Sequence, residues 1–284
     1  MKIPKRLQPL VEDGLVDEVI GRLMSGKEAD VFTVRCGGQV RCAKVYKDSM
    51  KRSFKQAVTY QEGRKVRSSR RARAMEKGSK FGRQQQEDVW QTSEVDALCR
   101  LAKVGVRVPT TYGCVDGVLL MDLITDSSGD PAPRLGELAM TAEQAREGHE
   151  IMMVYIKRML VAGIVHGDLS EFNVLVDELG PVVIDLPQAV DAAANNNAEA
   201  MLARDVRNIT RYYGAFAPEL LATKYAKEMW ALYEEGRLHN ETPLTGLFDE
   251  PTEAVDLDGV LREITSAIDE EEARLARLVE AESD

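Results

Sequence analysis

The octapeptide HGDLSEFN at residues 166–173 constrains this chain more than any other feature of its sequence. Asp168 and Asn173 lie five residues apart in this segment, and Asp185 follows twelve residues after Asn173 at the end of the apolar stretch VVID. Short apolar runs beside both motifs predict two strands joined by a tight turn, which would bring Asp185 back to the octapeptide. We therefore expect three oxygen-bearing side chains to lie together at one site.

Oxygen ligands with this spacing suit phosphoryl transfer from ATP. Such transfer needs an acceptor hydroxyl held in line, a group that accepts its proton, and metal ions that neutralise the phosphates. The spacing predicts Asp168 as the catalytic base, and Asn173 and Asp185 as ligands of Mg²⁺, with Mn²⁺ as the alternative ion. An Asp or Asn in an ordinary turn is common, but strands that flank both motifs favour the catalytic interpretation.

The N-terminal part of the chain supplies a matching lysine. Short apolar stretches within residues 15–46, broken by glycines, predict strands. Lys44 lies between apolar neighbours on the last of them, whereas a lone strand lysine is usually a solvated edge residue. In kinases a strand lysine reaches the phosphates and pairs with a helix glutamate. Glu94, in a predicted helix at 90–101, is the expected partner of Lys44.

The segment SGKEADVF at residues 25–32 is the expected phosphate loop, although it lacks the pattern GxGxxG. Gly26 is the residue that permits close approach of the backbone to a phosphate. The Ser25 hydroxyl and the Lys27 charge are expected to face phosphate oxygens. By itself this loop is a weak motif.

Strands that precede helices predict an α+β fold in two lobes. A helix from Thr141 to Ala162 is expected, with Thr141 as its N-cap and Gly163 just past its end. The predicted parts are an N-terminal extension at 1–14, a kinase domain at 15–250, and an acidic amphipathic C-terminal helix at 251–284. Within the domain we expect a β-rich N-lobe at about 15–120 with a flexible basic insertion at about 63–87, and a mainly helical C-lobe at about 125–250.

The net charge of −10 hides a strong asymmetry. Residues 41–86 carry fifteen Lys or Arg against three acids, whereas residues 249–284 carry thirteen acids against three Arg. The basic segment is either a solvated loop or a patch that docks rRNA, a ribosomal particle or an acidic protein through phosphate-type contacts. Autophosphorylation would fall on serines among these basic residues, where new phosphates could bind arginines: Ser68, Ser69 and Ser79.

No apolar run is long enough to cross a bilayer, and the first residues lack the apolar core of a secretory signal. The four cysteines form no CxxC pair, which favours small buried residues in a reducing compartment. A cytoplasmic location without a membrane partner is expected.

The motifs together resemble the RIO kinases, a family of atypical protein-serine/threonine kinases. The similarity rests on GKEADV, AKVYK, a basic insertion, LMDLI, PAPRL, HGDLSEFN, IDLPQAV and RDVRNI, in this order over about residues 15–235. The chain resembles the first subfamily and bacterial members more than the second subfamily. The resemblance implies a protein-kinase-like fold without an activation loop or peptide-docking helices.

The resemblance also implies functional positions. It places Ser25 and Lys27 on phosphates, Lys44 on the α- and β-phosphates, and the adenine on the backbone of Asp122 and Ile124. Asp205 is interpreted as a carboxylate that braces the catalytic loop. The chain has Gly167 where several relatives have Ala, and Leu-Pro-Gln after Asp185 where ordinary kinases have Phe-Gly.

Three functions from different classes remain open at this point. The first is a protein-serine/threonine kinase that transfers the ATP γ-phosphate to Ser or Thr, including its own. The second is an ATPase switch in ribosome small-subunit maturation, and the third is a small-molecule or sugar kinase, because such enzymes also use HGDxxxxN before an Ile-Asp strand.

Overall fold

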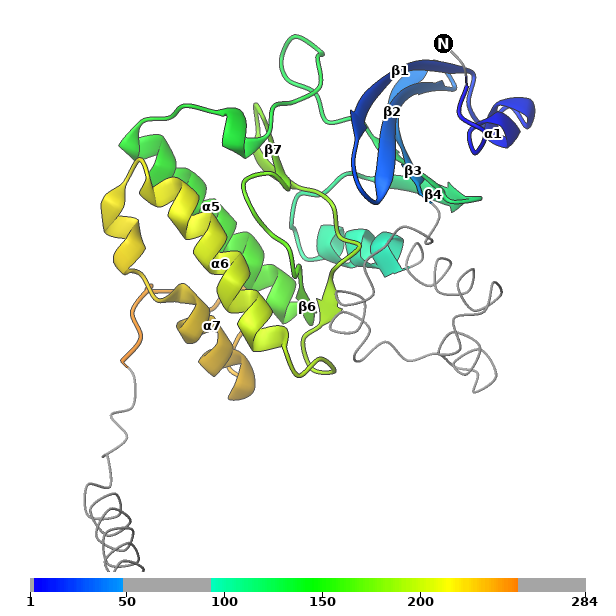
Figure 1. The fold of residues 1–284 in the computed structure, drawn as a ribbon. Coiled ribbons are helices and arrows are strands. Elements are labelled where there is room, and N and C mark those ends of the chain that lie inside the picture. Colours follow the sequence, from blue (N-terminus) through cyan, green and yellow to red (C-terminus); the bar gives the residue numbers. More distant parts are fainter. Residues whose placement is uncertain (1–2, 48–92, 250–284) are drawn as a thin grey trace, which may run out of the picture. The chain divides into compact units, whose positions relative to one another are not determined.

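A computed structural model describes residues 3–47 and 93–249 (Figure 1). By internal contacts the chain divides into two units, Met1–Leu247 and Phe248–Asp284. The elements described here belong to the first unit. The predicted insertion at 63–87, the three candidate phosphorylation sites within it and the predicted helix at 251–284 lie outside the described residues.

A five-stranded antiparallel sheet forms the N-lobe, with the order β1-β2-β3-β5-β4. β1 and β2 form a hairpin whose last strand pair is Ser25 with Asp30, so the expected phosphate loop is the turn of this hairpin. The strands are β1 (Glu18–Ser25), β2 (Ala29–Cys36), β3 (Gln39–Tyr46), β4 (Thr111–Val115) and β5 (Val118–Asp122).

Strand β3 places apolar and functional residues on opposite faces of the sheet, because successive side chains alternate along a strand. Ala43 and Val45 are buried in a cluster with Leu7 and Leu10, which lie in and just before α1 (Gln8–Glu12). The N-terminal residues therefore pack onto one face of the sheet. Lys44, the residue between the two apolar ones, belongs to the other face.

A helix at residues 93–103 covers that second face. Its apolar residues Leu98 and Leu101 share a buried cluster with Tyr46 of β3 and Leu119 of β5. The sheet is thus covered on both faces, and Glu94, near the start of the described part of this helix, faces the end of β3 that carries Lys44.

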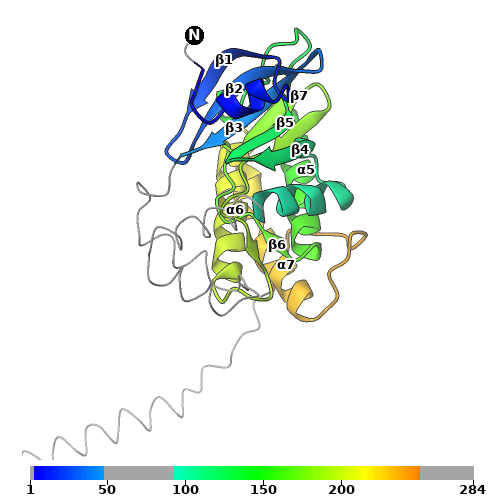
Figure 2. The same ribbon diagram turned by 90° about the vertical axis from the view of Figure 1, so that its right-hand side faces the viewer.

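Helices dominate the C-lobe, at the opposite end of this unit from the sheet (Figures 1 and 2). Thr141 caps α5 by accepting a bond from the Gln144 amide at 3.2 Å, and Gly163 follows its end with a φ of 70°, so the predicted cap residue and stop residue are confirmed. The helices are α5 (Ala142–Val161), α6 (Ala198–Gly214) and α7 (Tyr225–Glu234), with short 3₁₀ turns η2 (Leu135–Glu137) and η3 (Pro218–Ala222).

Two small antiparallel sheets carry the catalytic motifs. β7 (Val174–Asp177) and β8 (Gly180–Val183) form a hairpin, and β6 (Ile164–Val165) pairs with β9 (Val190–Asp191). HGDLSEFN therefore lies between β6 and β7, and Asp185 lies just after β8, as the alternation of apolar runs predicts. Residues 186–197 join Asp185 to α6.

The α+β architecture in two lobes agrees with the expectation from sequence. Among the described residues, none of the helices combines the length and the apolar character needed to span a bilayer.

Candidate active site

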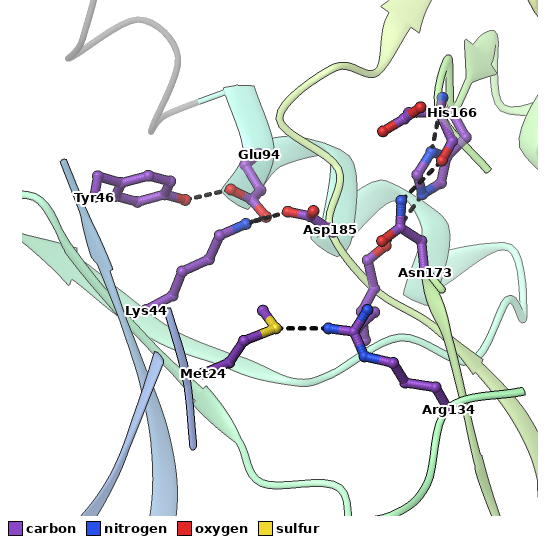
Figure 3. A network of polar contacts seen from close by, with 10 residues as sticks. Met24, Lys44, Tyr46, Glu94, Arg134, His166, Asn173 and Asp185 are labelled. Carbon is purple, nitrogen blue, oxygen red and sulfur yellow. Dashed lines mark hydrogen bonds and ion pairs between the residues drawn. The ribbon is translucent and has the colours of Figure 1, made fainter. Parts of the chain in front are cut away.

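Lys44 links the two lobes at the centre of the site (Figure 3). Its Nζ donates to Glu94 Oε1 at 2.7 Å and to Asp185 Oδ1 at 2.6 Å. Glu94 also accepts a bond from the Tyr46 hydroxyl through its second oxygen. Lys44 and Glu94 are buried, with 6% and 1% of their surface exposed, so the amine is held between two carboxylates with little water around it.

Burial opposes the charge on Lys44, but Glu94 and Asp185 outweigh it and raise the pKa of Lys44 above its ordinary value. Burial and the neighbouring Glu94 carboxylate both raise the pKa of Tyr46. The lysine is therefore a fixed cation and the tyrosine a fixed hydrogen-bond donor near neutral pH.

Two hydrogen bonds to backbone carbonyls help to hold the expected catalytic loop in place. The side-chain amide of Asn173 donates to the Asp168 carbonyl at 2.8 Å, and the Asn173 carbonyl accepts from the Ile184 amide at 3.0 Å. These two bonds bring Asp168, Asn173 and the residue before Asp185 together.

Asp168 is exposed at this site. Desolvation raises its pKa, and the nearby Asp185 carboxylate adds to this, while His166 and Arg204 oppose it.

Asp205 of α6 holds the same loop through hydrogen bonds, as expected from the sequence. Its two carboxylate oxygens accept the amides of Gly167 at 2.8 Å and Leu169 at 3.0 Å. Burial raises the pKa of Asp205 to about 6. The Gly167 carbonyl in turn accepts a bond from Arg204. His166 completes the brace, since its Nε2 lies 3.1 Å from the Ile184 carbonyl.

Asp185 adopts a left-handed backbone conformation, with a φ of 67°. Non-glycine residues adopt this conformation seldom, although Asp is one of the more tolerant types. It turns the chain directly after β8 and leaves 46% of the side chain exposed. Desolvation opposes ionisation, but Lys44 outweighs it and lowers the pKa of Asp185. The turn is thus made at Asp185 itself, without the glycine that follows this position in ordinary kinases.

The expected phosphate loop is held by Lys47, a residue that sequence reasoning missed. Lys47, just after β3, donates to the Gly26 carbonyl at 2.6 Å and to Ser25 Oγ at 3.2 Å, and lies 3.2 Å from Asp30. The Gly26 amide donates to the Ala29 carbonyl at 2.9 Å. A Cβ at Gly26 would lie 3.3 Å from that same oxygen. The glycine at this position is therefore explained by the close approach of the backbone and not by a positive φ.

Lys27 is exposed on the same turn, so Ser25, Gly26 and Lys27 stand together at its tip. Residues 122–124 begin at the end of β5 and lead toward the C-lobe. In this hinge the Asp122 amide donates to the Thr110 carbonyl and the Ile124 carbonyl accepts from the Ala132 amide, each at 2.9 Å. These bonds occupy the Asp122 amide and the Ile124 carbonyl.

Sequence reasoning also missed Tyr46 and the position of Arg134. Tyr46 could have been found, because it is two residues after Lys44 and so lies on the same face of β3. Arg134 lies in the PAPRL motif, and its Nη1 donates to the Phe172 carbonyl at 2.8 Å. Its Nη2 contacts the sulfur of Met24 in β1. No local pattern signals a contact that spans 110 residues.

The residues of the site fit Mg²⁺. This ion is commonly held by one or two carboxylates together with phosphate oxygens and waters. Asp185 offers an exposed carboxylate, and Asn173 turns its amide nitrogen to Asp168, which leaves Oδ1 as the ligating atom. Within residues 3–47 and 93–249, no group of three or more His, Cys, Asp or Glu side chains is arranged to hold a metal. The donor set suits an ion that is shared with phosphates.

Residues 30–226 match the RIO domain family, which is well over half of the chain. The chain belongs to the RIO family. Among relatives of this RIO chain, the RIO-type serine/threonine-protein kinase Rio1 of Haloferax volcanii is 35% identical over 205 residues, which are 72% of this chain and 66% of that protein. The serine/threonine-protein kinase RIO1 of Homo sapiens is 30% identical over 202 residues, 70% of this chain and 34% of the human protein. The chain thus spans just under two thirds of the archaeal relative and about a third of the human one.

Solved RIO structures share the fold of this chain. The Rio2 kinase of Chaetomium thermophilum, in its ADP/Mg²⁺-phosphoaspartate complex, matches with a TM-score of 0.57 at 20% identity, over 94% of this chain and 81% of that one. A second structure of that kinase gives a TM-score of 0.56 over 92% of this chain and 76% of that one. The expected RIO family and protein-kinase-like fold are confirmed.

Proposed function

We propose that this chain is an atypical protein-serine/threonine kinase that transfers the γ-phosphoryl group of ATP to a protein hydroxyl, including its own. The observation that carries the proposal is the cation of Lys44, buried between Glu94 and Asp185 and next to the loop that bears Asp168. An amine in this position would bind phosphates from the N-lobe side, while the acceptor hydroxyl and its base would lie on the C-lobe side.

Asp168 would accept the proton of the acceptor hydroxyl. Its carboxylate is exposed, and its raised pKa makes it a stronger base than an ordinary aspartate. Asn173 and Asp185 would hold Mg²⁺, which when bound neutralises charge on the phosphate oxygens. Lys44 would bind the α- and β-phosphates, with Glu94 fixing the direction of its amine.

The nucleotide would lie under the β1–β2 turn. Ser25, Gly26 and Lys27 would contact phosphates, and the carbonyl of Asp122 and the amide of Ile124 would bind the adenine. These roles are supported by the tethering of the turn through Lys47 and by the bonds that already occupy the Asp122 amide and the Ile124 carbonyl.

Relatives support the substrate class. The proteins that match over about 70% of the chain are named serine/threonine-protein kinases, which favours a protein hydroxyl over a sugar or another small molecule as acceptor. The Rio2 kinase complex with ADP and Mg²⁺ supports ATP and Mg²⁺ as ligands of this chain.

A second candidate function is an ATPase switch acting in ribosome small-subunit maturation. It is favoured by the phosphoaspartate in the Rio2 complex. In this chain Asp185 would accept the phosphoryl group from ATP, releasing ADP, and water would then cleave the acyl phosphate to inorganic phosphate. The basic segment 41–86, most of which lies outside the described residues, would dock the rRNA or ribosomal particle.

We further propose a cytoplasmic location. All four cysteines are free, which suits a reducing compartment.

Mass spectrometry of the full chain after incubation with Mg·ATP tests the proposal. We expect phosphoserine in the basic segment, with Ser68, Ser69 and Ser79 as the candidate positions. Asp168→Ala should lower the rate of labelling by about 10²–10⁴-fold, the range for loss of a general base. Asp185→Ala should abolish labelling by removing a metal ligand.

The chemical stability of the label separates the two candidate functions. Phosphoserine survives acid, whereas an acyl phosphate is cleaved by hydroxylamine. ATP turnover without phosphoserine, stimulated by ribosomal particles, would favour the switch. Equal labelling of wild type and Asp185→Ala would contradict the metal assignment.

A further inference from the structure

Arg134 carries a cation beside the site that the proposed mechanism does not use. It lies directly before η2, and its Nη1 donates to the backbone carbonyl of Phe172 at 2.8 Å. Its Nη2 contacts the thioether of Met24, which is a weak acceptor. Within the described parts of the chain this guanidinium forms no ion pair with a carboxylate.

The position of this cation is fixed by neighbours of the proposed site. Phe172 directly precedes Asn173, and Met24 directly precedes Ser25. Figure 3 shows two connections that run from the N-lobe to the C-lobe, Lys44 to Asp185 and Met24 to Arg134, with the Arg134 guanidinium near Asn173.

The two connections differ in strength. The Lys44 amine is buried between two carboxylates. Arg134 is only partly buried, and its partner Met24 is an uncharged thioether. A phosphate oxygen is a far stronger partner for a guanidinium than a thioether, because the bond is charge-assisted. Arg134 could therefore exchange Met24 for a phosphate while keeping its bond to Phe172.

We propose that Arg134 binds the terminal phosphoryl group of ATP and leaves Met24 when the nucleotide enters. This inference rests on the proposed function, because it assumes that ATP lies between the phosphate loop and the catalytic loop. Of the three phosphates, the terminal one would lie nearest Asn173 and Asp185, and so nearest the tethered guanidinium. During transfer Arg134 would stabilise negative charge on the oxygens of this group, and electrostatic stabilisation is usually the main contribution of a protein to such reactions.

Nucleotide affinity tests the inference without catalysis. The dissociation constants of Mg²⁺ complexes of AMP-PNP and ADP are measured by calorimetry on the full chain and on Arg134→Gln. Loss of one charged bond should weaken AMP-PNP binding about tenfold and ADP binding less than about twofold. Arg134→Lys should retain part of the AMP-PNP affinity as a point charge. Arg146→Gln is the matched control, because its guanidinium pairs with the exposed Glu219 away from this loop.

Equal weakening of AMP-PNP and ADP binding by Arg134→Gln, or unchanged binding of both, would overturn the inference. Met24→Ala separates phosphate binding by Arg134 from a structural role of its contact with Met24. If Arg134 binds the phosphate, the ratio of the AMP-PNP and ADP affinities should stay at its wild-type value in this variant. A ratio shifted as in Arg134→Gln would show that the contact with Met24 is what matters. Arg134→Gln could instead bind both nucleotides as the wild type does but change the preference between acidic and neutral acceptor peptides. That result would overturn the inference and assign Arg134 to recognition of the acceptor.

The inference and the proposed function fail separately. If wild type shows the Arg134-dependent preference for AMP-PNP but labels no protein, the kinase proposal fails and the phosphate site stands. If wild type forms phosphoserine while Arg134→Gln keeps its full affinity and rate, the kinase proposal stands and the role of Arg134 is refuted.

Discussion

Lys44 shows how a buried charge is made tolerable. A lone ammonium without water would lose its proton, but two carboxylates within hydrogen-bond distance hold it in the charged form. Glu94 needs partners of its own, and the hydroxyl of Tyr46 satisfies its second oxygen. Each member of this group is therefore fixed by another, and the direction of the Lys44 amine depends on all of them.

Tyr46→Phe should lower the kcat/KM for ATP about tenfold. The change removes one hydrogen bond to a buried carboxylate, and such bonds contribute about 1.5–3 kcal/mol. Glu94 could then rotate and misdirect Lys44. Steady-state kinetics of phosphorylation measure the effect. Tyr225→Phe is the matched control, because this partly buried ring of α7 packs against His149, away from the proposed site. Kinetics of Tyr46→Phe equal to those of Tyr225→Phe would refute the role of Tyr46.

At the scale of elements, α6 determines where the catalytic loop lies. Asp205 on this helix accepts two loop amides, and α6 is itself positioned by packing against α5. Gly148 of α5 lies against the ring of Tyr213 of α6, which is buried. The absence of a side chain at Gly148 lets the two helices approach closely.

Gly148→Ala should destabilise the fold by about 1–3 kcal/mol, the usual cost of overpacking a core. The added Cβ would lie 2.7 Å from Tyr213 Cε1 and 2.8 Å from its hydroxyl oxygen. Alanine has a helix propensity about 1 kcal/mol more favourable than glycine. The measured change in the free energy of unfolding is therefore the cost of the clash with Tyr213 minus this gain. Denaturation by urea gives the free energy of unfolding. Glu147→Ala, at an exposed position of the same helix, should change it by less than about 0.5 kcal/mol. A more stable Gly148→Ala variant would contradict the close packing.

At the scale of the whole molecule, two buried groups give the stability opposite dependences on pH. Burial raises the pKa of Asp205 to about 6, so its contribution to stability is lost as the pH rises from about 4 to about 6. Burial lowers the pKa of His149 from 6.5 to about 4, so its contribution is lost as the pH falls through the same range. The two slopes oppose each other in the wild type.

Asp205→Asn should therefore become more stable, relative to wild type, as the pH rises from about 4 to about 6. The variant lacks the group whose contribution falls in this range, while His149 keeps the contribution that rises. Free energies of unfolding from urea titrations at several pH values measure the slope. His149→Gln should change the slope in the opposite direction. Identical slopes for wild type and Asp205→Asn would show that Asp205 is already ionised at the low end of the range.

The sequence by itself determined the spacing of the oxygen-bearing side chains in the expected catalytic loop and the main elements that carry them. The spacing of Asp168, Asn173 and Asp185 is a property of one hairpin and its flanking loops, and Thr141 caps α5 through a residue three positions away. Such features follow from the local geometry of strands and helices, because backbone period and hydrogen bonding act over a few residues.

Tertiary structure alone decided how the lobes meet. Lys44 contacts Asp185 across 141 residues, and Arg134 contacts Met24 across 110. The left-handed turn at Asp185 is likewise set by its surroundings, since the residue type tolerates this conformation but does not require it. These features depend on how separate elements pack, and a contact between distant segments is chosen by the free energy of the whole packed arrangement, not by the residues on either side of it.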